Sequence, residues 1–195
     1  GMVAEAQAGK TAAVEKSETI SAGANLGMYI GGLGTSSGKN TGTITTTTGT
    51  GVYVEGAGNS FDGSAGKIEV VTSGIGIYLE NTGSNKIKSG ILDIASGAVG
   101  VYGDNAKIDF TVNSSTSIGV TARNNSVISG NITTGTGSVG AYILDGTVSL
   151  NGAVITTGVN TSDTSVGILL DKGITSTYTI NNVNVNARNG VGIYL

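Results

Sequence analysis

The chain has 195 residues, of which 34 are Gly, and it contains no Pro, Cys, His or Trp. The lack of Cys and His excludes thiol nucleophiles, histidine bases and the common structural zinc sites, and the lack of both Pro and a three-residue Gly period excludes collagen. A formal net charge of −3 with only ten Lys and Arg argues against a nucleic-acid partner, and no apolar run approaches the ~20 residues of a membrane-spanning helix.

Residues 1–20 do not share the pattern of the rest of the chain. Gly1 and Met2 look like the remnant of an expression tag. The alanines, glutamates and lysines that follow are compatible with a short helix, a partial capping coil or a frayed tail. We therefore treat 1–20 as an N-terminal tail or partial cap and expect one structural domain over 21–195.

After residue 20 one phrase recurs, in which an apolar residue or Thr is followed by Gly, an aliphatic residue, usually Tyr, and a further apolar or small residue. Its eight copies are Leu26–Ile30, Thr50–Val54, Ile75–Leu79, Val99–Gly103, Ile118–Ala122, Val139–Ile143, Val166–Leu170 and Val191–Leu195. Each copy has one glycine at its second position, and these eight glycines are named the anchor glycines. Their spacing is uneven, shortest between Gly100 and Gly119 and longest between Gly140 and Gly167. The chain is therefore a repeat with a mean period of about 24 residues.

Each phrase has the two-residue period of a β-strand. We expect the residues before Gly, after Gly and after Tyr to face inward, and Gly and Tyr to face outward. Further alternating runs predict shorter strands between the phrases at Lys67–Val71, Ile91–Ile94, Lys107–Val112 and Thr147–Leu150. No segment after residue 20 has a helical period, and β-branched residues and Gly dominate, so we expect no helix there.

A unit of about 24 residues cannot bury its apolar face alone, so neighbouring units must stack. Parallel pairing of equivalent strands predicts an all-β fold, a right-handed parallel β-helix of seven to eight coils, because parallel crossovers are right-handed. A propeller blade needs a longer repeat, and a sandwich does not explain the similarity of the phrases. The last phrase ends at Leu195 without a polar cap, so we expect a fragment of a longer solenoid.

Two positions after the phrase are polar in most copies. The fourth residue after the anchor glycine is charged in five copies, at Glu55, Glu80, Asp104, Arg123 and Asp171. The fifth residue is Asn81, Asn105, Asn124, Asp145 and Lys172 in the copies of Gly76, Gly100, Gly119, Gly140 and Gly167. Because Asn tolerates the left-handed backbone conformation, we expect a solvated turn at this fifth position.

Two segments, GIGIYLENTGSNKI at 74–87 and GVGIYL at 190–195, resemble the passenger domains of bacterial type V autotransporter adhesins, as do the Gly-, Asn-, Ser- and Thr-rich spacers. The similarity is to the large fusobacterial outer-membrane autotransporters and covers roughly residues 20–195. It implies export, anchoring of the full protein by a C-terminal outer-membrane barrel, and display on the bacterial cell surface.

The resemblance also implies a non-catalytic function, as an adhesin stalk or as a binding surface for glycans or proteins of host cells or other bacteria. Two alternatives stay open: a β-helical polysaccharide-cleaving enzyme, and a structural spacer without a ligand.

The strongest candidate site is a row of tyrosines at one outward position of the repeat. Its members are Tyr29, Tyr53, Tyr78, Tyr102, Tyr142 and Tyr194, and Thr121 and Leu169 interrupt it. Each ring either shields the neighbouring anchor glycines or forms part of an amphipathic platform for sugars or a partner protein. We expect this platform, if any part of the chain, to bind the ligand.

Other signals are weaker. Glu69 and Asp93 both precede an anchor glycine by seven positions, so they should face outward about 4.8 Å apart on adjacent coils, a spacing near that of a retaining glycosidase pair. Thr runs at 45–47, 133–134 and 156–157 suggest an ice-binding surface, but the unequal coil lengths spoil the flat lattice that it needs. The GxGxxG match at 135–140 has no helix after it. We expect no catalysis, no metal and no cofactor.

Overall fold

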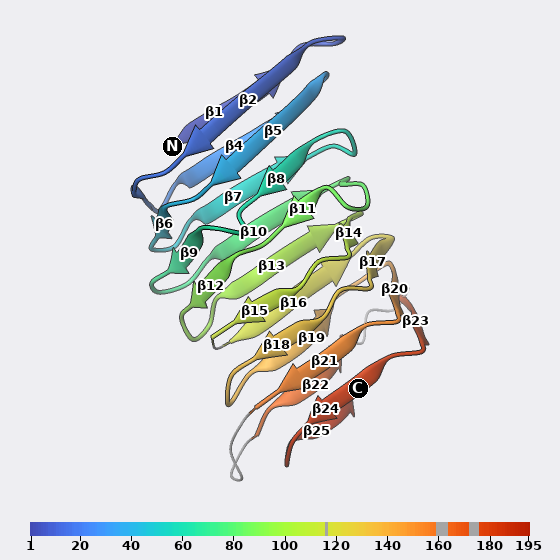
Figure 1. Cartoon of the computed structure of the whole chain (residues 1–195). Helices are drawn as coiled ribbons and strands as arrows, with labels where there is room; N and C mark the ends of the chain where they lie inside the picture. The colour runs from blue at the N-terminus through green and yellow to red at the C-terminus, as the bar shows by residue number, and fades with distance from the viewer. Residues whose placement is uncertain (116, 159–163, 172–175) are drawn as a thin grey trace.

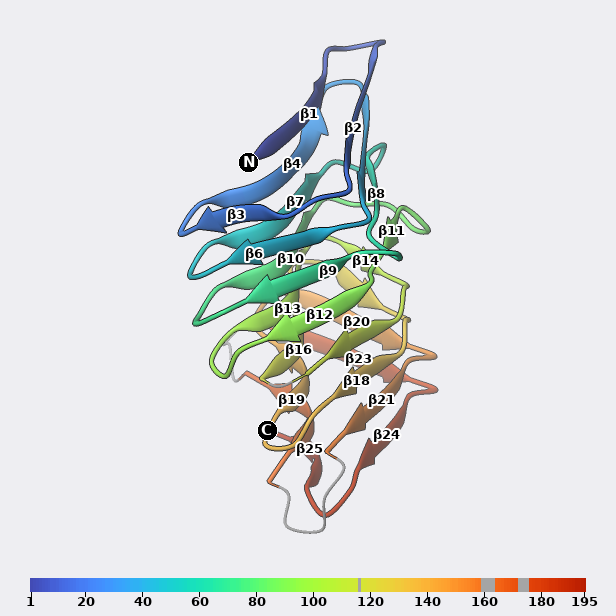
Figure 2. The ribbon, with the colours of Figure 1, turned by 60° about the vertical axis from the view of Figure 1, so that its left-hand side comes forward.

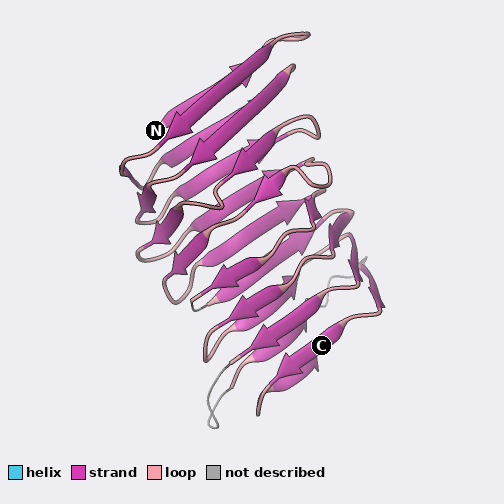
Figure 3. Ribbon diagram, viewed as in Figure 1, coloured by secondary structure: helices cyan, strands magenta, loops and turns pink. Residues whose placement is uncertain are grey.

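The computed structural model describes residues 1–115, 117–158, 164–171 and 176–195. In these ranges the chain consists of strands and turns, and every strand pair is parallel (Figures 1 and 3). No helix in the described part is long and apolar enough to cross a membrane. The strands stack as a β-solenoid of eight three-strand coils followed by one more strand, which confirms the predicted parallel β-helix.

The coils follow one another with a right-handed turn and present three faces (Figures 1 and 2). The first face is a nine-stranded sheet that carries all eight phrases. Its strands are β1 (Met2–Ala6), β4 (Leu26–Gly32), β7 (Thr50–Glu55), β10 (Ile75–Glu80), β13 (Val99–Asp104), β16 (Ile118–Arg123), β19 (Val139–Ile143), β22 (Val166–Leu170) and β25 (Val191–Tyr194).

The second face is an eight-stranded sheet that packs against the first. Its strands are β3 (Ile20–Gly23), β6 (Thr43–Thr46), β9 (Lys67–Val70), β12 (Ile91–Ile94), β15 (Val112–Ser114), β18 (Ile132–Thr134), β21 (Val154–Thr157) and β24 (Asn184–Ala187). Both large sheets run without interruption along the solenoid.

The third face is divided into two four-stranded sheets. The first contains β2 (Thr11–Lys16), β5 (Thr35–Asn40), β8 (Ser60–Asp62) and β11 (Ile87–Lys88). The second contains β14 (Lys107–Ile108), β17 (Ser126–Ile128), β20 (Thr147–Asn151) and β23 (Thr177–Asn181). The third face therefore has a seam between β11 and β14, and β14 belongs to the shortest coil, between Gly100 and Gly119.

The solenoid begins earlier than the boundary expected at residue 21. Strands β1 and β2 lie within residues 1–20 and pair in register with β4 and β5. Together with β3 they form a complete first coil, so this segment is neither a helix nor a tail. The repeated phrase was not recognised in this first coil because its tyrosine is absent: Val3 occupies the position that Tyr29 has in the second coil.

The interior is filled by aliphatic side chains from all three faces. Met28, Ile77 and Leu79 of the first face, Ile44 of the second and Phe61 of the third are fully buried or nearly so. They belong to one continuous cluster that extends from Ile20 to Leu170. Burial of such side chains is the main favourable contribution to stacking.

The spacer strands match the expected ones in three of four cases. The run Lys107–Val112 instead divides into β14 and β15, with the chain turning between them. This run lies in the shortest coil. Because that coil has few residues, the turn from the third face to the second face falls inside a stretch whose sequence alternates like a single strand.

The anchor glycines do not face outward as expected. A methyl group added at Gly51 would lie 2.6 Å from Cγ2 of Ile68 inside the solenoid and 2.7 Å from the carbonyl oxygen of Gly76 in the next coil. Gly27 likewise faces Ile44 of the second sheet. Glycine is therefore needed at this position because the two large sheets and consecutive coils approach too closely for a side chain.

The turn predicted after the phrase is confirmed. Asn81, Asn105 and Asn124 have φ values of 53°, 50° and 45°, in the left-handed region that Asn tolerates. Nδ2 of Asn105 donates a 2.7 Å hydrogen bond to Oδ1 of Asn81, which links two coils. Lys172, expected at the same position, lies outside the described residues.

Replacing Gly51 by Ala should lower the free energy of unfolding by about 1–3 kcal/mol, because the added methyl group overpacks the interior. Gly192→Ala is the matched control, since no described atom lies within 4 Å of the same position there, and it should change stability by less than about 0.5 kcal/mol. Urea denaturation followed by circular dichroism measures both. Equal stability of the two variants would contradict this account of the anchor glycines.

Candidate functional site

The six predicted tyrosines occupy one column on the outer side of the nine-stranded sheet. Strand register aligns Tyr29 with Tyr53, Tyr53 with Tyr78, and Tyr78 with Tyr102. The column continues through Thr121, Tyr142, Leu169 and Tyr194. We call these positions the tyrosine column. Tyr194 is 56% exposed, and the other five tyrosines are half-buried.

The first four rings of the column contact one another. The ring centroids of Tyr29 and Tyr53 are 5.5 Å apart, and those of Tyr53 and Tyr78 are 4.9 Å apart, both edge to face. Tyr78 and Tyr102 are stacked at 5.0 Å with an interplanar angle of 8°. Such contacts add stability beyond the buried area, so this stretch is a continuous aromatic surface over four coils.

A second column beside the tyrosines, called the acidic column, contains Glu55, Glu80, Asp104 and Asp171, and three of these carboxylates accept hydrogen bonds from the hydroxyl groups of Tyr29, Tyr53 and Tyr142. Tyr29 Oη donates a 2.8 Å hydrogen bond to Oε2 of Glu55, and Tyr142 Oη donates a 3.1 Å hydrogen bond to Oδ2 of Asp171. Tyr53 Oη donates to Glu80 in the same way. In each case the tyrosine bonds to the carboxylate of the following coil.

The pKa values of these phenols are displaced by that arrangement. The hydrogen bond to Glu55, with burial and carboxylate charge adding to it, raises the pKa of Tyr29 to about 12. Burial and the hydrogen bond to Glu80 raise the pKa of Tyr53 further. Burial also raises the pKa of Tyr78 and of Tyr142. The phenols therefore stay neutral hydrogen-bond donors at physiological pH.

The acidic column changes sign at its centre. Arg123 aligns with Asp104 of the preceding coil, and its Nε lies 3.1 Å from Oδ1 of Asp145 and 3.7 Å from Oδ2 of Asp104. A hydrogen bond with Tyr102 raises the pKa of Arg123. A fixed guanidinium therefore stands where the ring contacts end and Thr121 interrupts the tyrosine column.

An aliphatic column lies on the other side of the tyrosines, and sequence reasoning assigned it to the interior. Because the anchor glycine faces inward, the residue before it faces outward and is only half-buried or exposed. The residues of this column are Leu26, Thr50, Ile75, Val99, Ile118, Val139, Val166 and Val191. The sequence analysis placed these residues inside because it did not recognise that the anchor glycines face inward. An alternating pattern of apolar residues does not show this.

The aliphatic and tyrosine columns share a shallow hollow. It has a volume of about 350 Å³ and is lined by residues that include Leu26, Thr50, Tyr53 and Tyr78. An apolar wall, an aromatic wall and a nearby row of carboxylates form a surface that suits an amphipathic partner.

The proposed shielding of anchor glycines by tyrosines is wrong, because those glycines point into the core. Gly31 is a different case, since a methyl group added there would clash with the ring and hydroxyl of Tyr29. This ring therefore leans over its own strand toward Glu55.

The carboxylate pair on the second face lies on adjacent coils and is bridged by a single lysine. Glu69 and Asp93 are aligned on adjacent coils as expected. Nζ of Lys67 lies 3.4 Å from Oε1 of Glu69 and 2.8 Å from Oδ2 of Asp93. The hydrogen bond from Lys67 lowers the pKa of Asp93, which is opposite to what a glycosidase general acid requires.

The threonine runs do not form one array. Thr133 and Thr156 align with each other, but Asn113 and Asn186 flank them in the same column. Thr45 aligns with Glu69 and donates a 3.0 Å hydrogen bond to it. The regular threonine lattice of an ice-binding surface is therefore interrupted by amides and charges.

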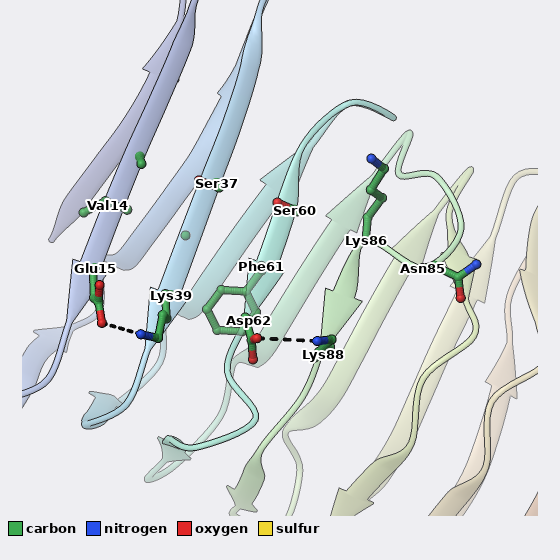
Figure 4. Close-up of a pocket in the computed structure, with 12 residues that line it drawn as sticks. Val14, Glu15, Ser37, Lys39, Ser60, Phe61, Asp62, Asn85, Lys86 and Lys88 are labelled. Atoms are coloured by element: carbon green, nitrogen blue, oxygen red, sulfur yellow. Dashed lines mark hydrogen bonds and ion pairs between the residues drawn. The ribbon is translucent and has the colours of Figure 1, made fainter.

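A further hollow, of about 590 Å³, lies on the third face and was not anticipated. Charged side chains from four coils cross it in one line (Figure 4). Their order is Glu15, Lys39, Asp62 and Lys88. The sequence did not suggest this line because residues 1–20 were not recognised as a coil and the third-face strands lack a repeated phrase.

Replacing Glu55 by Gln should return the pKa of Tyr29 toward the usual value of about 10. Because the folded-state pKa is raised, the bond to Glu55 stabilises the fold below pH ~10, and that contribution is lost as the pH rises from ~10 through ~12. The chemical shift of the Tyr29 ring carbon bonded to oxygen reports the titration. Glu18→Gln, which alters an exposed ion pair with Lys16, should leave the pKa unchanged. A wild-type pKa near 10 would contradict the bond.

Comparison of the chain with protein-family models, with curated proteins and with solved structures found no match in any of the three.

Proposed function

We propose that this chain is a segment of the passenger of a bacterial type V autotransporter, displayed at the cell surface and anchored through the outer membrane by the rest of the protein. It acts as a non-catalytic adhesin stalk whose nine-stranded face binds glycans or proteins of host cells or other bacteria. The single observation that supports binding is the stretch of four mutually contacting rings, Tyr29, Tyr53, Tyr78 and Tyr102, flanked by the aliphatic column on one side and the acidic column on the other.

The proportions of the solenoid suit a stalk. Eight coils at ~4.8 Å each give a rod roughly 40 Å long, whose two large sheets are continuous. Each coil contacts only its neighbours, so further coils extend such a rod without changing its cross-section. A rod of this kind projects a more distal module away from the cell.

The tyrosine column suits a binding surface because its rings are preorganised. Tyr53 contacts rings on both sides, and its hydroxyl is held by Glu80. Little side-chain entropy remains to be lost when a ligand covers it. Tyrosine presents a large contact area with a polar end, which matches both sugar rings and protein side chains.

The test is the triple variant of Tyr53, Tyr78 and Tyr102 to Ser, assayed for binding to host cells, to other bacteria and to a glycan array. Binding should fall by at least tenfold, while the β-type circular dichroism spectrum is retained. The control is Leu33→Ser, because Leu33 is an exposed large apolar side chain that lies outside the column.

If the triple variant binds as well as the wild type, the column has only a structural role. If the wild-type chain binds none of these surfaces, the result favours a spacer. Shortened polysaccharide products formed by the wild type and lost on replacing Glu69 and Asp93 by Ala would instead favour an enzyme.

A further inference from the structure

Four charged side chains of alternating sign cross the third face, one on each of the first four coils. Glu15 aligns with Lys39, Lys39 with Asp62, and Asp62 with Lys88. Nζ of Lys39 lies 2.6 Å from Oε1 of Glu15, and Nζ of Lys88 lies 3.7 Å from Oδ2 of Asp62. These four residues are called the charged row (Figure 4), and their side chains are 44–68% exposed.

A second column runs beside the charged row and has one long side chain. Ala13 aligns with Ser37, and Ser37 with Ser60. Lys86 comes next, because it precedes Ile87, which aligns with Phe61. The side chains of this column are therefore small on the first three coils and long on the fourth. All four residues line the hollow of about 590 Å³.

The order of charges in the charged row is complementary to the same order read in the opposite direction. Read from the first coil to the fourth its signs are minus, plus, minus, plus, and read backward they are plus, minus, plus, minus. A second copy turned about a two-fold axis parallel to the strands, passing between Lys39 and Asp62, places opposite charges against each other at all four positions. Two-fold interfaces of this kind are the commonest in homo-oligomers.

We propose that the third face formed by β2, β5, β8 and β11 is a self-association surface, on which a second copy of this chain docks with its solenoid axis antiparallel. Glu15 of one copy faces Lys88 of the other, and Lys39 faces Asp62, each pair occurring twice. Complementary charges fix the orientation of such an interface as well as favouring encounter.

The neighbouring column fits the same arrangement by size. The two-fold axis sets Lys86 of one copy opposite Ala13 of the other and Ser37 opposite Ser60. The one long side chain of the column thus points into the part of the partner's hollow where the side chain is smallest. Charge and shape therefore specify the same antiparallel orientation.

The parallel arrangement is disfavoured by the same residues. A two-fold axis along the solenoid would set Glu15 against Glu15 and Lys88 against Lys88, and like charges across an interface select against that partner geometry. The antiparallel pair is the one that the surface permits.

The expected association is weak. Four coils spaced ~4.8 Å apart and strands of up to six residues at ~3.3 Å each cover roughly 400 Å² per copy, below the ~800 Å² per partner of standard stable interfaces. The contacts are exposed ion pairs, which salt screens. We therefore expect a concentration-dependent dimer that dissociates as ionic strength rises.

The experiment is sedimentation equilibrium of the whole chain at low and high salt, with the variants Lys39→Glu, Asp62→Lys and their combination. Each single change sets like charges against each other twice in the dimer, so dimerisation should weaken about tenfold. In the double variant Glu replaces Lys39 and faces the Lys that replaces Asp62, so dimerisation should return toward wild type.

The controls distinguish this surface from the rest of the third face and from a purely structural role of the row. Lys107→Glu makes the same charge change on the second sheet of the third face and should leave the dimer intact. Within one copy the double variant places like charges on adjacent coils, so a purely structural role predicts additive damage and no rescue. Circular dichroism checks that each variant is folded.

Three outcomes would overturn the proposal. The first is a wild-type chain that stays monomeric at millimolar concentration and low salt. The second is a dimer unaffected by Lys39→Glu, which would arise from the exposed coil ends. The third is a monomer that binds an acidic oligosaccharide, such as oligogalacturonate but not its methyl ester, across the same row. None of them depends on whether the tyrosine column binds a ligand.

Discussion

Close contact between consecutive coils at the anchor glycines is the constraint on which the rest of the structure depends. At Gly51 the interior side chain of Ile68 and the backbone of Gly76 leave no room for a methyl group. This contact sets the spacing of the two large sheets and the register of the phrases. Each surface column exists because equivalent residues are held one above another by that register.

The fold was predictable because one pattern repeats eight times and has a single physical solution. Parallel stacking follows from units too small to bury their own apolar face, and the positions of Tyr53 and Tyr78 in one column follow from the shared register. The left-handed turns at Asn81 and Asn105 were predictable for a local reason, the tolerance of Asn for that backbone conformation.

The errors arose where strand alternation fails to describe the backbone. In the first seven phrases two consecutive residues, such as Gly76 and Ile77, are both buried, so the residue before them, here Ile75, faces outward. Strict alternation placed Gly and Ile75 on the wrong sides. The first coil was missed because it lacks the phrase, and the break within Lys107–Val112 was missed because a corner can interrupt an alternating run without Gly or Pro.

The two candidate surfaces differ in how far the amino-acid sequence alone reveals them. The tyrosine column was visible because one residue type recurs at one position. The charged row was not, because its members are of opposite sign and lie at unequal intervals in strands without a common motif. Only coordinates show that residues separated by unequal lengths of chain lie in one line.

The seam between β11 and β14 has a mechanical consequence. Two sides of the rod carry unbroken hydrogen-bonded ladders, whereas the third is interrupted near its middle. Tension along the axis is therefore borne mainly by the nine- and eight-stranded sheets, and the interrupted side offers the least resistance to flexing. Any bending of the rod should therefore concentrate where the third face changes from its first four-stranded sheet to its second.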